Sequence, residues 1–337
     1  MVRLSDFDYH LPDELIAQTP LSDRAASRLL HLDKTSGEVA HLNFRDCTDL
    51  LGAEDVLVLN NTRVNAWRFI GEKLTGAKIE ILALKELESG VFECLVKPAK
   101  RLKPNDPIMI SPILSAEFVG QGDEAIRHIR FSSPVDLYQA MDEAGNVPLP
   151  PYITETLDDR ERYQTVVAQH PGSAAAPTAG LHFTPEILDQ IKSRGVSIAE
   201  VTLHVGIDTF RPVQTDDVTD HQMHGEICEI LPHVAHLINK RKGRLIAVGT
   251  TSVRTLESFA NPSGEIEPGR QESKIFITPG YKFRALDGMF TNFHLPKTTM
   301  LLMISALAGR ENILDAYREA VENRYRFLSF GDSMLIL

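Results

Sequence analysis

Short apolar runs separated by turn residues occur along the whole chain, and their pattern changes twice. Residues 55–60, DVLVLN, form an apolar run that ends in Asn-Asn-Thr-Arg. Such a run is typical of a buried strand, which here delivers polar side chains to a loop. Before it, residues 11–18 and the stretch RAASRLLHL that Asp23 opens predict one or two lead-in helices.

Between residues 64 and 147 the pattern changes to short segments rich in β-branched and aromatic residues, such as AWRFIG, KIEILALKEL and VFECLVKP. Glycine, proline and Asn-Asp turns separate them at spacings of roughly 8 to 12 residues, which predicts a small barrel or sandwich. Residues 145–152, GNVPLPPY, contain too much proline for a helix or a central strand and are typical of a stiff linker. We therefore expect residues 64–147 to form an inserted all-β barrel domain.

After residue 150, strand and helix patterns alternate. Thr184, Pro185 and Glu186 supply a capping hydroxyl, a first-turn proline and a first-turn acid to a helix that Gly195 ends. The other elements expected here are strands at residues 196–206, 244–249, 274–280 and 288–294 and helices at 233–242, 250–260, 298–309 and 312–327. This alternation predicts an α/β fold, a Rossmann-like main domain formed by residues 1–63 and 148–337.

Length and composition narrow the class of protein. With 337 residues, 43% of them hydrophobic, the chain is long enough to bury a full core in two domains. The longest apolar stretches, such as residues 300–308, are shorter than the roughly 20 residues of a membrane span, and the acidic start has no secretory apolar run. Cys47, Cys94 and Cys228 are odd in number and widely spaced, which fits reduced thiols. We expect a cytoplasmic protein that does not associate with membranes.

The net charge of −11 argues against broad, nonspecific binding to nucleic acid, because neutralising phosphates requires clustered cations. Two short basic runs nevertheless occur, at residues 97–103 and 240–244. Each run is either solvated surface or a local phosphate-binding track.

Histidines gather between residues 170 and 226. His182, His204, His221 and His224 lie there with Glu226 and several glycines. Because imidazole changes charge near neutral pH, such a group suits proton transfer in either direction. The spacing of His221, His224 and Glu226 also resembles a zinc site, but the HExxH order and a strong fourth ligand are missing. We therefore expect acid–base chemistry and no metal.

Three further segments predict ligand contacts. Residues 249–252 connect a buried strand to a helix whose first amides are free, and with Arg254 they form a candidate pocket for a phosphate or carboxylate, with simple N-capping as the alternative. Residues 177–183, PTAGLHF, place small residues around a turn beside His182. Residues 291–296 end a strand with Asn292 and His294 on one face, where ligands bind in open α/β sheets.

Long stretches along the chain match one enzyme family: FDYHLPDELIAQTP, DVLVLNNTRV, VKPAKRLK, NVPLPPYI, GSAAAPTAGLHFT, LHVGIDTFRPV, HQMHGE, RLIAVGTTSVRTLES, TNFHLPKTTMLLM and YRFLSFGDSMLI. They run from one end of the sequence to the other. The sequence resembles the S-adenosylmethionine:tRNA ribosyltransferase-isomerases of queuosine biosynthesis.

The resemblance implies an enzyme that transfers and isomerises the ribosyl part of S-adenosylmethionine. The acceptor is 7-aminomethyl-7-deazaguanine in a tRNA anticodon, the product is epoxyqueuosine-tRNA, and adenine and methionine leave. S-adenosylmethionine is then a cosubstrate, and no other cofactor is expected. The partner is the tRNA anticodon stem-loop, and the enzyme is expected to act as a monomer.

The resemblance also suggests roles for residues. His221 or His224 is expected to act as base or acid with Glu226 orienting it, and His182 to contact adenine or ribose. The substrate contacts are expected from Asn60, Arg63, Thr178, Gly180, His204, Thr250, Thr251, Ser252, Arg254, Asn292 and His294. Arg254 and residues 250–252 are expected to hold the methionine carboxylate.

The tRNA is expected to bind to Lys97, Lys100, Arg101 and Lys103. Two rival interpretations remain open from the sequence. One is a metal-dependent hydrolase built on the histidines, and the other is a nonenzymatic RNA-binding module.

Overall fold

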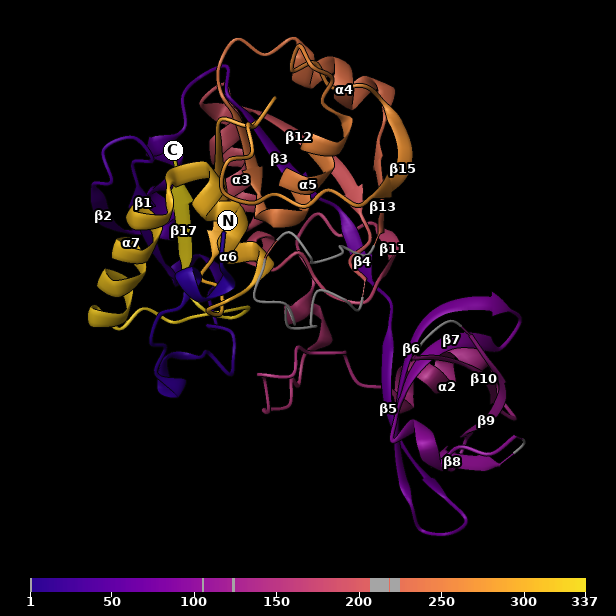
Figure 1. Cartoon of the computed structure of the whole chain (residues 1–337). Coiled ribbons are helices and arrows are strands. Elements are labelled where there is room, and N and C mark those ends of the chain that lie inside the picture. The colour runs from indigo at the N-terminus through magenta and orange to yellow at the C-terminus, as the bar shows by residue number, and fades with distance from the viewer. Residues whose placement is uncertain (1, 105, 123–124, 207–217, 219–224) are drawn as a thin grey trace.

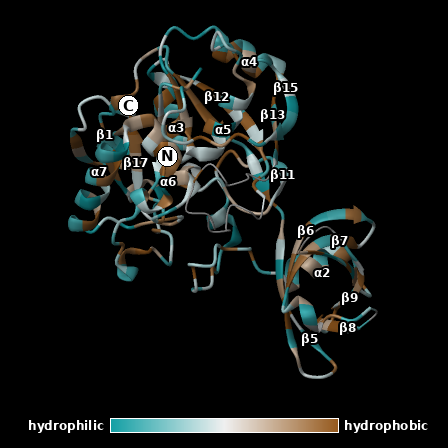
Figure 2. Ribbon diagram, viewed as in Figure 1, coloured by the Kyte–Doolittle hydropathy of each residue, from teal (hydrophilic) through white to brown (hydrophobic). Residues whose placement is uncertain are grey.

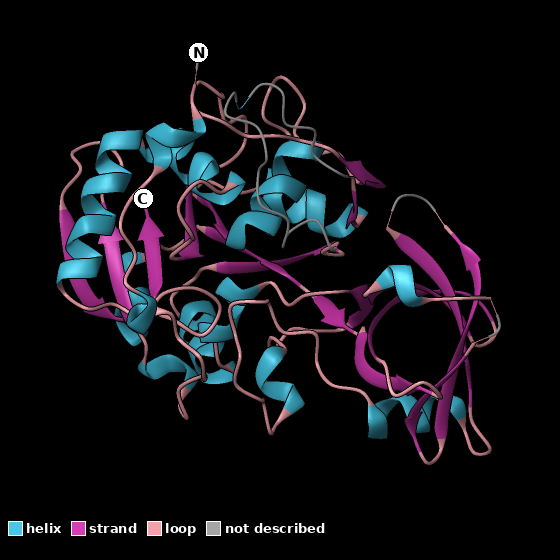
Figure 3. Ribbon diagram, turned by 60° about the horizontal axis from the view of Figure 1, so that its bottom comes forward, coloured by secondary structure: helices cyan, strands magenta, loops and turns pink. Residues whose placement is uncertain are grey.

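The computed structural model describes residues 2–104, 106–122, 125–206, 218 and 225–337. The chain forms two bodies (Figure 1): a larger one that contains both ends of the chain and a smaller β-barrel that projects from it. Figure 3, turned by 60°, shows the same separation between the strands of the barrel and those of the larger sheet.

The smaller body is a closed antiparallel barrel in the order β10-β7-β6-β5-β8-β9. Its strands are β5 (Trp67–Lys73), β6 (Lys78–Glu88), β7 (Val91–Lys97), β8 (Pro107–Ser111), β9 (Leu114–Gln121) and β10 (Ile126–Ser132). Phe69, Ile81, Phe92 and Phe131 fill the interior, and helix α2 (Leu137–Ala144) packs against it. The expected β-barrel is confirmed, whereas its limits at residues 64 and 147 stay a prediction.

The larger body is built on a mixed sheet in the order β15-β13-β12-β3-β14-β16-β17-β1-β2. Its strands are β1 (Arg28–Leu32), β2 (Val39–Asn43), β3 (Val56–Asn60), β12 (Ser197–Leu203), β13 (Glu226–Ile230), β14 (Leu245–Val248), β15 (Gly269–Ser273), β16 (Gly288–Asn292) and β17 (Ser333–Ile336). Among the described strands, four neighbouring pairs are parallel and four are antiparallel. A mixed α/β fold is therefore confirmed, but a Rossmann-like main domain is not.

The sheet of the larger body is buried on both faces, which explains why β3 is an unbroken apolar run. Val56 and Val58 join the core on one side, whereas Leu57 and Leu59 join the core on the other side. The first core contains residues of α4 (Pro232–Asn239), α5 (Gly249–Phe259), α6 (Thr299–Ala308) and α7 (Arg310–Glu322). The second contains residues of α1 (Cys47–Leu50) and α3 (Pro185–Ser193).

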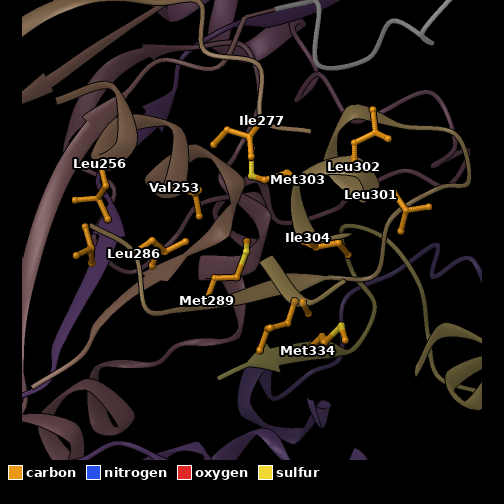
Figure 4. Close-up of a cluster of buried hydrophobic side chains, with 14 of the residues drawn as sticks. Val253, Leu256, Ile277, Leu286, Met289, Leu301, Leu302, Met303, Ile304 and Met334 are labelled. Carbon is orange, nitrogen blue, oxygen red and sulfur yellow. The ribbon is translucent and has the colours of Figure 1, made fainter. Parts of the chain in front are cut away.

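Figure 4 shows the centre of the first core, where methionine and leucine side chains of α5, α6, β16 and β17 interdigitate. Helix α6 is apolar almost all round because it lies between this core and α7, and its Thr298 accepts a hydrogen bond from the Leu301 amide at 3.4 Å. Helix α7 is amphipathic, with Ile313, Tyr317 and Ala320 inside. In Figure 2 the outer helices α4 and α7 accordingly carry much teal.

A small parallel pair of strands, β4 (Thr62–Val64) and β11 (His170–Ser173), lies where the chain leaves the large sheet for the barrel. Single helical turns complete the described elements: η1 (Leu4–Phe7), η2 (Asp13–Leu15), η3 (Arg24–Ala26), η4 (Phe44–Asp46), η5 (Ala99–Arg101), η6 (Arg160–Tyr163) and η7 (Thr178–His182). No helix among the described residues is long and apolar enough to cross a membrane.

Two local predictions were wrong. The lead-in segment forms only the turns η2 and η3, and after the Asp23 cap the chain enters β1, because β1 pairs with β17 from the other end of the chain. The strand expected at residues 274–280 is not formed, and the real strand is β15, just before it. Its sequence, GRQES, is mostly exposed and polar, so no apolar pattern marks it.

Candidate functional site

A cavity of about 510 Å³ opens in the larger body, and we call it the hollow. Most of its lining comes from five segments of chain: residues 150–152, 175–179, 249–251, 291–300 and 328–329. Its volume lies within the roughly 300–1,000 Å³ typical of small-molecule sites. Segments far apart in the sequence therefore converge on one binding-sized space.

The hollow lies at the carboxyl ends of two neighbouring parallel strands, β14 and β16. Strand β14 runs into Gly249, whose φ of +84° is a conformation that favours glycine, and β16 ends at Asn292. This is the position at which open α/β sheets bind ligands, and residues 291–296 line the hollow there, while ligand binding by them stays a prediction.

Asn292 is the centre of a buried hydrogen-bond chain on the wall of the hollow. Its Oδ1 accepts from Thr178 Oγ1 at 2.9 Å, and its Nδ2 lies 3.2 Å from His182 Nε2. The other ring nitrogen of His182, Nδ1, lies 2.8 Å from Ser27 Oγ. The side chain of Asn292 is only 3% exposed, so its amide is held in one orientation.

Both ring nitrogens of His182 are thus engaged by protein groups. The imidazole is 4% exposed, lies 5.1 Å from the Phe44 ring and lines a cavity of about 30 Å³ beside the hollow. Burial, with Arg326 and Arg24 nearby, lowers the pKa of His182 to about 4. At neutral pH this imidazole is neutral and serves as a hydrogen-bonding group.

His294 lines the hollow just beyond the end of β16. Its Nε2 lies 2.7 Å from Thr291 Oγ1, its backbone amide donates to the Tyr317 hydroxyl at 3.0 Å, and its carbonyl accepts from the Tyr9 hydroxyl. Burial lowers the pKa of His294 to about 4 as well. Two neutral imidazoles therefore stand in or beside the hollow.

The N-terminus of helix α5 contributes Gly249, Thr250 and Thr251 to the hollow. The first amides of a helix lack intrahelical partners and carry partial positive charge, which favours an anion there. Thr251 Oγ1 is buried and has no hydrogen-bond partner among the described residues. The backbone and the threonines of the predicted anion pocket therefore line the hollow, and anion binding by them stays a prediction.

The rest of that predicted pocket lies elsewhere. Ser252 donates to the Val248 carbonyl at 2.8 Å, inside the helix. Arg254 points away from the hollow and forms a buried ion pair with Glu226, while its Nη2 donates to the Ser273 carbonyl at 3.3 Å. Glu226 Oε1 also accepts the Gly206 amide at 2.9 Å.

Glu226 and Arg254 belong to a second polar group, which we call the polar junction, formed by Asn60, Thr62, His204, Glu226 and Arg254. Asn60 bridges β3 to β12: its Nδ2 donates to the Leu203 carbonyl at 3.0 Å, and its Oδ1 accepts the Thr62 and Leu203 amides. His204 Nδ1 lies 2.7 Å from Thr62 Oγ1, and burial lowers its pKa. The junction residues thus pair with one another and with neighbouring backbone groups.

Other predicted residues do not reach the hollow. Arg63 pairs with Glu161 at the surface. Gly180 is buried, and a side chain there would meet Thr165 Cγ2 at 2.9 Å, so this glycine is needed for packing. His221 and His224 lie outside the described residues.

The sequence interpretation missed several lining residues. Pro150, Pro151 and Tyr152, interpreted as linker, line the hollow, and the Tyr152 hydroxyl lies 2.7 Å from Ser329 Oγ. Ser27, which fixes His182, was also missed. The NVPLPPYI and YRFLSFGDSMLI matches contain Tyr152 and Ser329 and were the available signal.

On the barrel, Lys97, Lys100 and Lys103 are exposed around the turn η5, to which the backbone of Arg101 also belongs. No described residue pairs with any of these three lysines in an ion pair, so their charges face solvent. Within the described part of the chain, no group of histidine, cysteine and acidic side chains is arranged to hold a metal ion.

Comparisons with known proteins agree over nearly the whole chain. The profile of a family described as "Queuosine biosynthesis protein" matches residues 4–336. A protein of Clostridioides difficile named S-adenosylmethionine:tRNA ribosyltransferase-isomerase is 52% identical over 99% of this chain and 100% of its own length. A protein of the same name from Desulforamulus reducens is 51% identical and is covered completely in both directions.

A solved structure is similar as well. The crystal structure of S-adenosylmethionine tRNA ribosyltransferase from Thermotoga maritima matches with a TM-score of 0.56 and 36% sequence identity. The match covers 98% of this chain and 100% of that one.

Proposed function

The chain belongs to the queuosine biosynthesis protein family, and on this premise we propose that the hollow binds S-adenosylmethionine for a ribosyltransferase-isomerase reaction on tRNA. The enzyme transfers and isomerises the ribosyl moiety of S-adenosylmethionine onto 7-aminomethyl-7-deazaguanine in the anticodon. Epoxyqueuosine-tRNA is formed, and adenine and methionine are released. The observation that carries the assignment to this site is the nucleoside-sized cavity at the carboxyl ends of β14 and β16.

Two features of the hollow support a charged nucleoside as its ligand. The N-terminus of α5, with Thr250 and Thr251, offers amides and hydroxyls to the methionine carboxylate. The second feature is the charge of the lining. Lys297 is the one charged residue among the described residues that line the hollow, and its Nζ lies 2.7 Å from Asp8 Oδ2. Its positive charge is therefore balanced by that carboxylate and does not oppose a cationic ligand. In this proposal Arg254 does not contact the ligand, because its charge is paired with Glu226. It supports the site indirectly, by holding α5 to the polar junction.

The proton transfers need groups that titrate near neutral pH. His182 and His294, with a pKa of about 4, are neutral there and serve as hydrogen-bonding groups. We therefore keep His221 or His224 as the acid or base. Glu226 keeps a positioning role, because Arg254 and the Gly206 amide already engage its carboxylate.

The tRNA contacts are proposed on the barrel, at Lys97, Lys100, Arg101 and Lys103. Exposed cations on one turn can neutralise successive phosphates of a stem without base readout. All proposed contacts come from one chain, which fits the expected monomer. Residues 64–147 thereby serve as the tRNA-binding domain, and the reaction needs no cofactor beyond S-adenosylmethionine.

The test is the release of adenine from S-adenosylmethionine in the presence of tRNA that carries 7-aminomethyl-7-deazaguanine. We expect release by the purified protein, unchanged by chelators, and loss of at least about 100-fold in turnover for His221→Asn or His224→Asn, the usual contribution of general acid–base catalysis. Unchanged turnover in both variants would remove the acid–base assignment.

The rival functions give different results. A metal-dependent hydrolase would lose activity with a chelator and regain it with zinc. An RNA-binding module without activity would bind the tRNA and release no adenine.

A further inference from the structure

Asn292 has an unusual position among the residues of the hollow: its carboxamide is the only one among the described lining residues. Carboxamides carry a donor and an acceptor side by side in one plane. The hydroxyl groups of the lining can rotate, and the two nitrogens of His294 lie on different edges of its ring. Among the side chains of the described lining, a fixed donor and acceptor pair is therefore available at Asn292 alone.

The partners of Asn292 decide which of its hydrogen-bonding positions remain free. Thr178 donates a hydrogen bond to one lone pair of Oδ1, and His182 accepts a hydrogen bond from one of the two N–H groups of Nδ2. One lone pair of Oδ1 and one N–H of Nδ2 are left. Because Asn292 lines the hollow, we assign these two positions to a ligand in it.

Adenine matches this pair. Its N6 amine is a donor and its N7 is an acceptor, and a carboxamide pairs with both at once, as asparagine does with adenine in the DNA major groove. We propose that Asn292 recognises the adenine of S-adenosylmethionine through N6 and N7, with Oδ1 accepting from N6 and Nδ2 donating to N7. This inference rests on the proposed function and names the part of the cosubstrate that this wall of the hollow binds.

The contact to N7 also bears on the reaction. When the bond between the ribosyl carbon and N9 breaks, its electron pair moves onto the purine. A donor at N7 stabilises the charge that develops there, and it does so more strongly in the transition state than in the bound cosubstrate. Asn292 therefore assists the departure of adenine without transferring a proton.

His182 and Ser27 act through Asn292 and are positioning residues. Asn292 Nδ2 donates to His182 Nε2, so this nitrogen is the acceptor of the ring and Nδ1 carries the proton, which His182 donates to Ser27 Oγ. Ser27 Oγ in turn lies 3.5 Å from the Arg24 carbonyl. This chain of hydrogen bonds prevents the side-chain amide of Asn292 from flipping, which would exchange its donor and its acceptor.

The first experiment compares cosubstrates on the wild-type protein. Adenine or base release is measured with S-adenosylmethionine, with its 7-deaza analogue, in which N7 is replaced by C–H, and with its 6-oxo analogue, in which the amine is replaced by a carbonyl. We expect kcat/KM to be lower for each analogue by about 5- to 150-fold, the discrimination that a bidentate pair gives. Equal kcat/KM for all three would overturn the inference.

The second experiment tests whether Asn292 is the residue that contacts N7. In Asn292→Ala, kcat/KM for S-adenosylmethionine falls, and the preference over the 7-deaza analogue shrinks to the part that comes from the poorer leaving ability of the 7-deaza base itself, because no donor faces N7. The matched control is Ser329→Ala, which also changes the lining of the hollow and keeps the preference. Preserved discrimination in Asn292→Ala would contradict the contact even if its overall activity were low.

A third variant pair tests the positioning role. His182→Ala is expected to reduce the preference for S-adenosylmethionine over the 7-deaza analogue, and His182→Gln to restore it, because a glutamine amide can accept from Asn292 and donate to Ser27. Equal preference in both variants would show that His182 does not position Asn292. If the wild-type protein releases no adenine from S-adenosylmethionine with tRNA, the proposed function itself fails.

Discussion

The hollow and the polar junction both contain buried polar residues, but they use them differently. In the junction, Asn60 directs both ends of its amide to backbone groups, and Glu226 and Arg254 neutralise each other. In the hollow, Asn292 keeps free hydrogen-bonding positions, and Thr251 Oγ1 has no described partner. The difference lies in where the polar groups find partners.

A buried polar group without a hydrogen bond costs about 1–3 kcal/mol, so proteins rarely leave one unpaired without reason. The junction joins the ends of β3, β12 and β13 and pairs most of its groups, although Arg254 Nε has no hydrogen-bond partner among the described residues. The hollow leaves groups for a ligand. Removing a junction residue should therefore change stability first, and removing a hollow residue should change catalysis first.

The largest effect is expected from Arg254→Met. It removes the guanidinium that neutralises the buried Glu226 carboxylate, and breaking a buried ion pair typically costs about 3–5 kcal/mol. The free energy of unfolding from urea denaturation, compared with that of wild type, measures this loss. Arg45→Met is the control, because Arg45 and Asp23 form an exposed pair and exposed pairs contribute about 0–1 kcal/mol. A loss below about 1 kcal/mol in Arg254→Met would remove the distinction between the junction and a surface pair.

A smaller effect for each residue is expected from acid. Burial holds the pKa of His182 and His294 at about 4, whereas an unfolded histidine titrates near 6.5. Each group stabilises the fold fully above about pH 6.5, and this contribution is lost as the pH falls toward 4, because the unfolded chain then binds more protons. The expected loss is about 3 kcal/mol for each histidine.

Urea denaturation between pH 7 and 4 measures this loss. In His182→Gln, the free energy of unfolding that is lost between pH 7 and 4 should be smaller by the contribution of one histidine. His41→Asn, which removes a more exposed histidine, is the control. An unchanged pH dependence in His182→Gln would mean that His182 has the same pKa in the folded and the unfolded protein.

The smallest effect per residue is expected on the barrel, far from both polar regions. Replacing Lys97, Lys100 and Lys103 with glutamine should leave stability unchanged, weaken tRNA binding and reduce its salt slope by about one unit for each phosphate that is no longer neutralised. The control changes Lys192, Lys274 and Lys282, which lie on the larger body and give the same change in net charge. Equal weakening by both triple variants, measured by titration at several salt concentrations, would mean that only net charge matters.

Local signals predicted much of the fold. Thr184 and Pro185 marked the start of α3 because capping is a property of a few neighbouring residues. The barrel was predictable from its turns and its alternating strands. In contrast, β1 was interpreted as helix, because what makes it a strand is β17, about 300 residues away in the sequence.

The candidate site was predictable only in part, for the same reason. Strand ends and the start of α5 are local features, so Asn292, Thr250 and Thr251 were found from the sequence. The pairing of Arg254 with Glu226 and the contact of Ser27 with His182 join segments that no local pattern connects. The sequence showed which side chains are chemically able to bind, and the tertiary structure decided which of them face the hollow.

The chain that returns from the barrel leads directly into the wall of the cavity. Asn146 is bridged to Arg68 at the foot of the barrel, and only a few residues later Pro150, Pro151 and Tyr152 form part of the cavity lining. A macromolecule held by the barrel and a small molecule held in the cavity therefore share one short tether. By thermodynamic reciprocity, whatever tension one of them places on this tether changes the affinity of the other by the same factor in both directions.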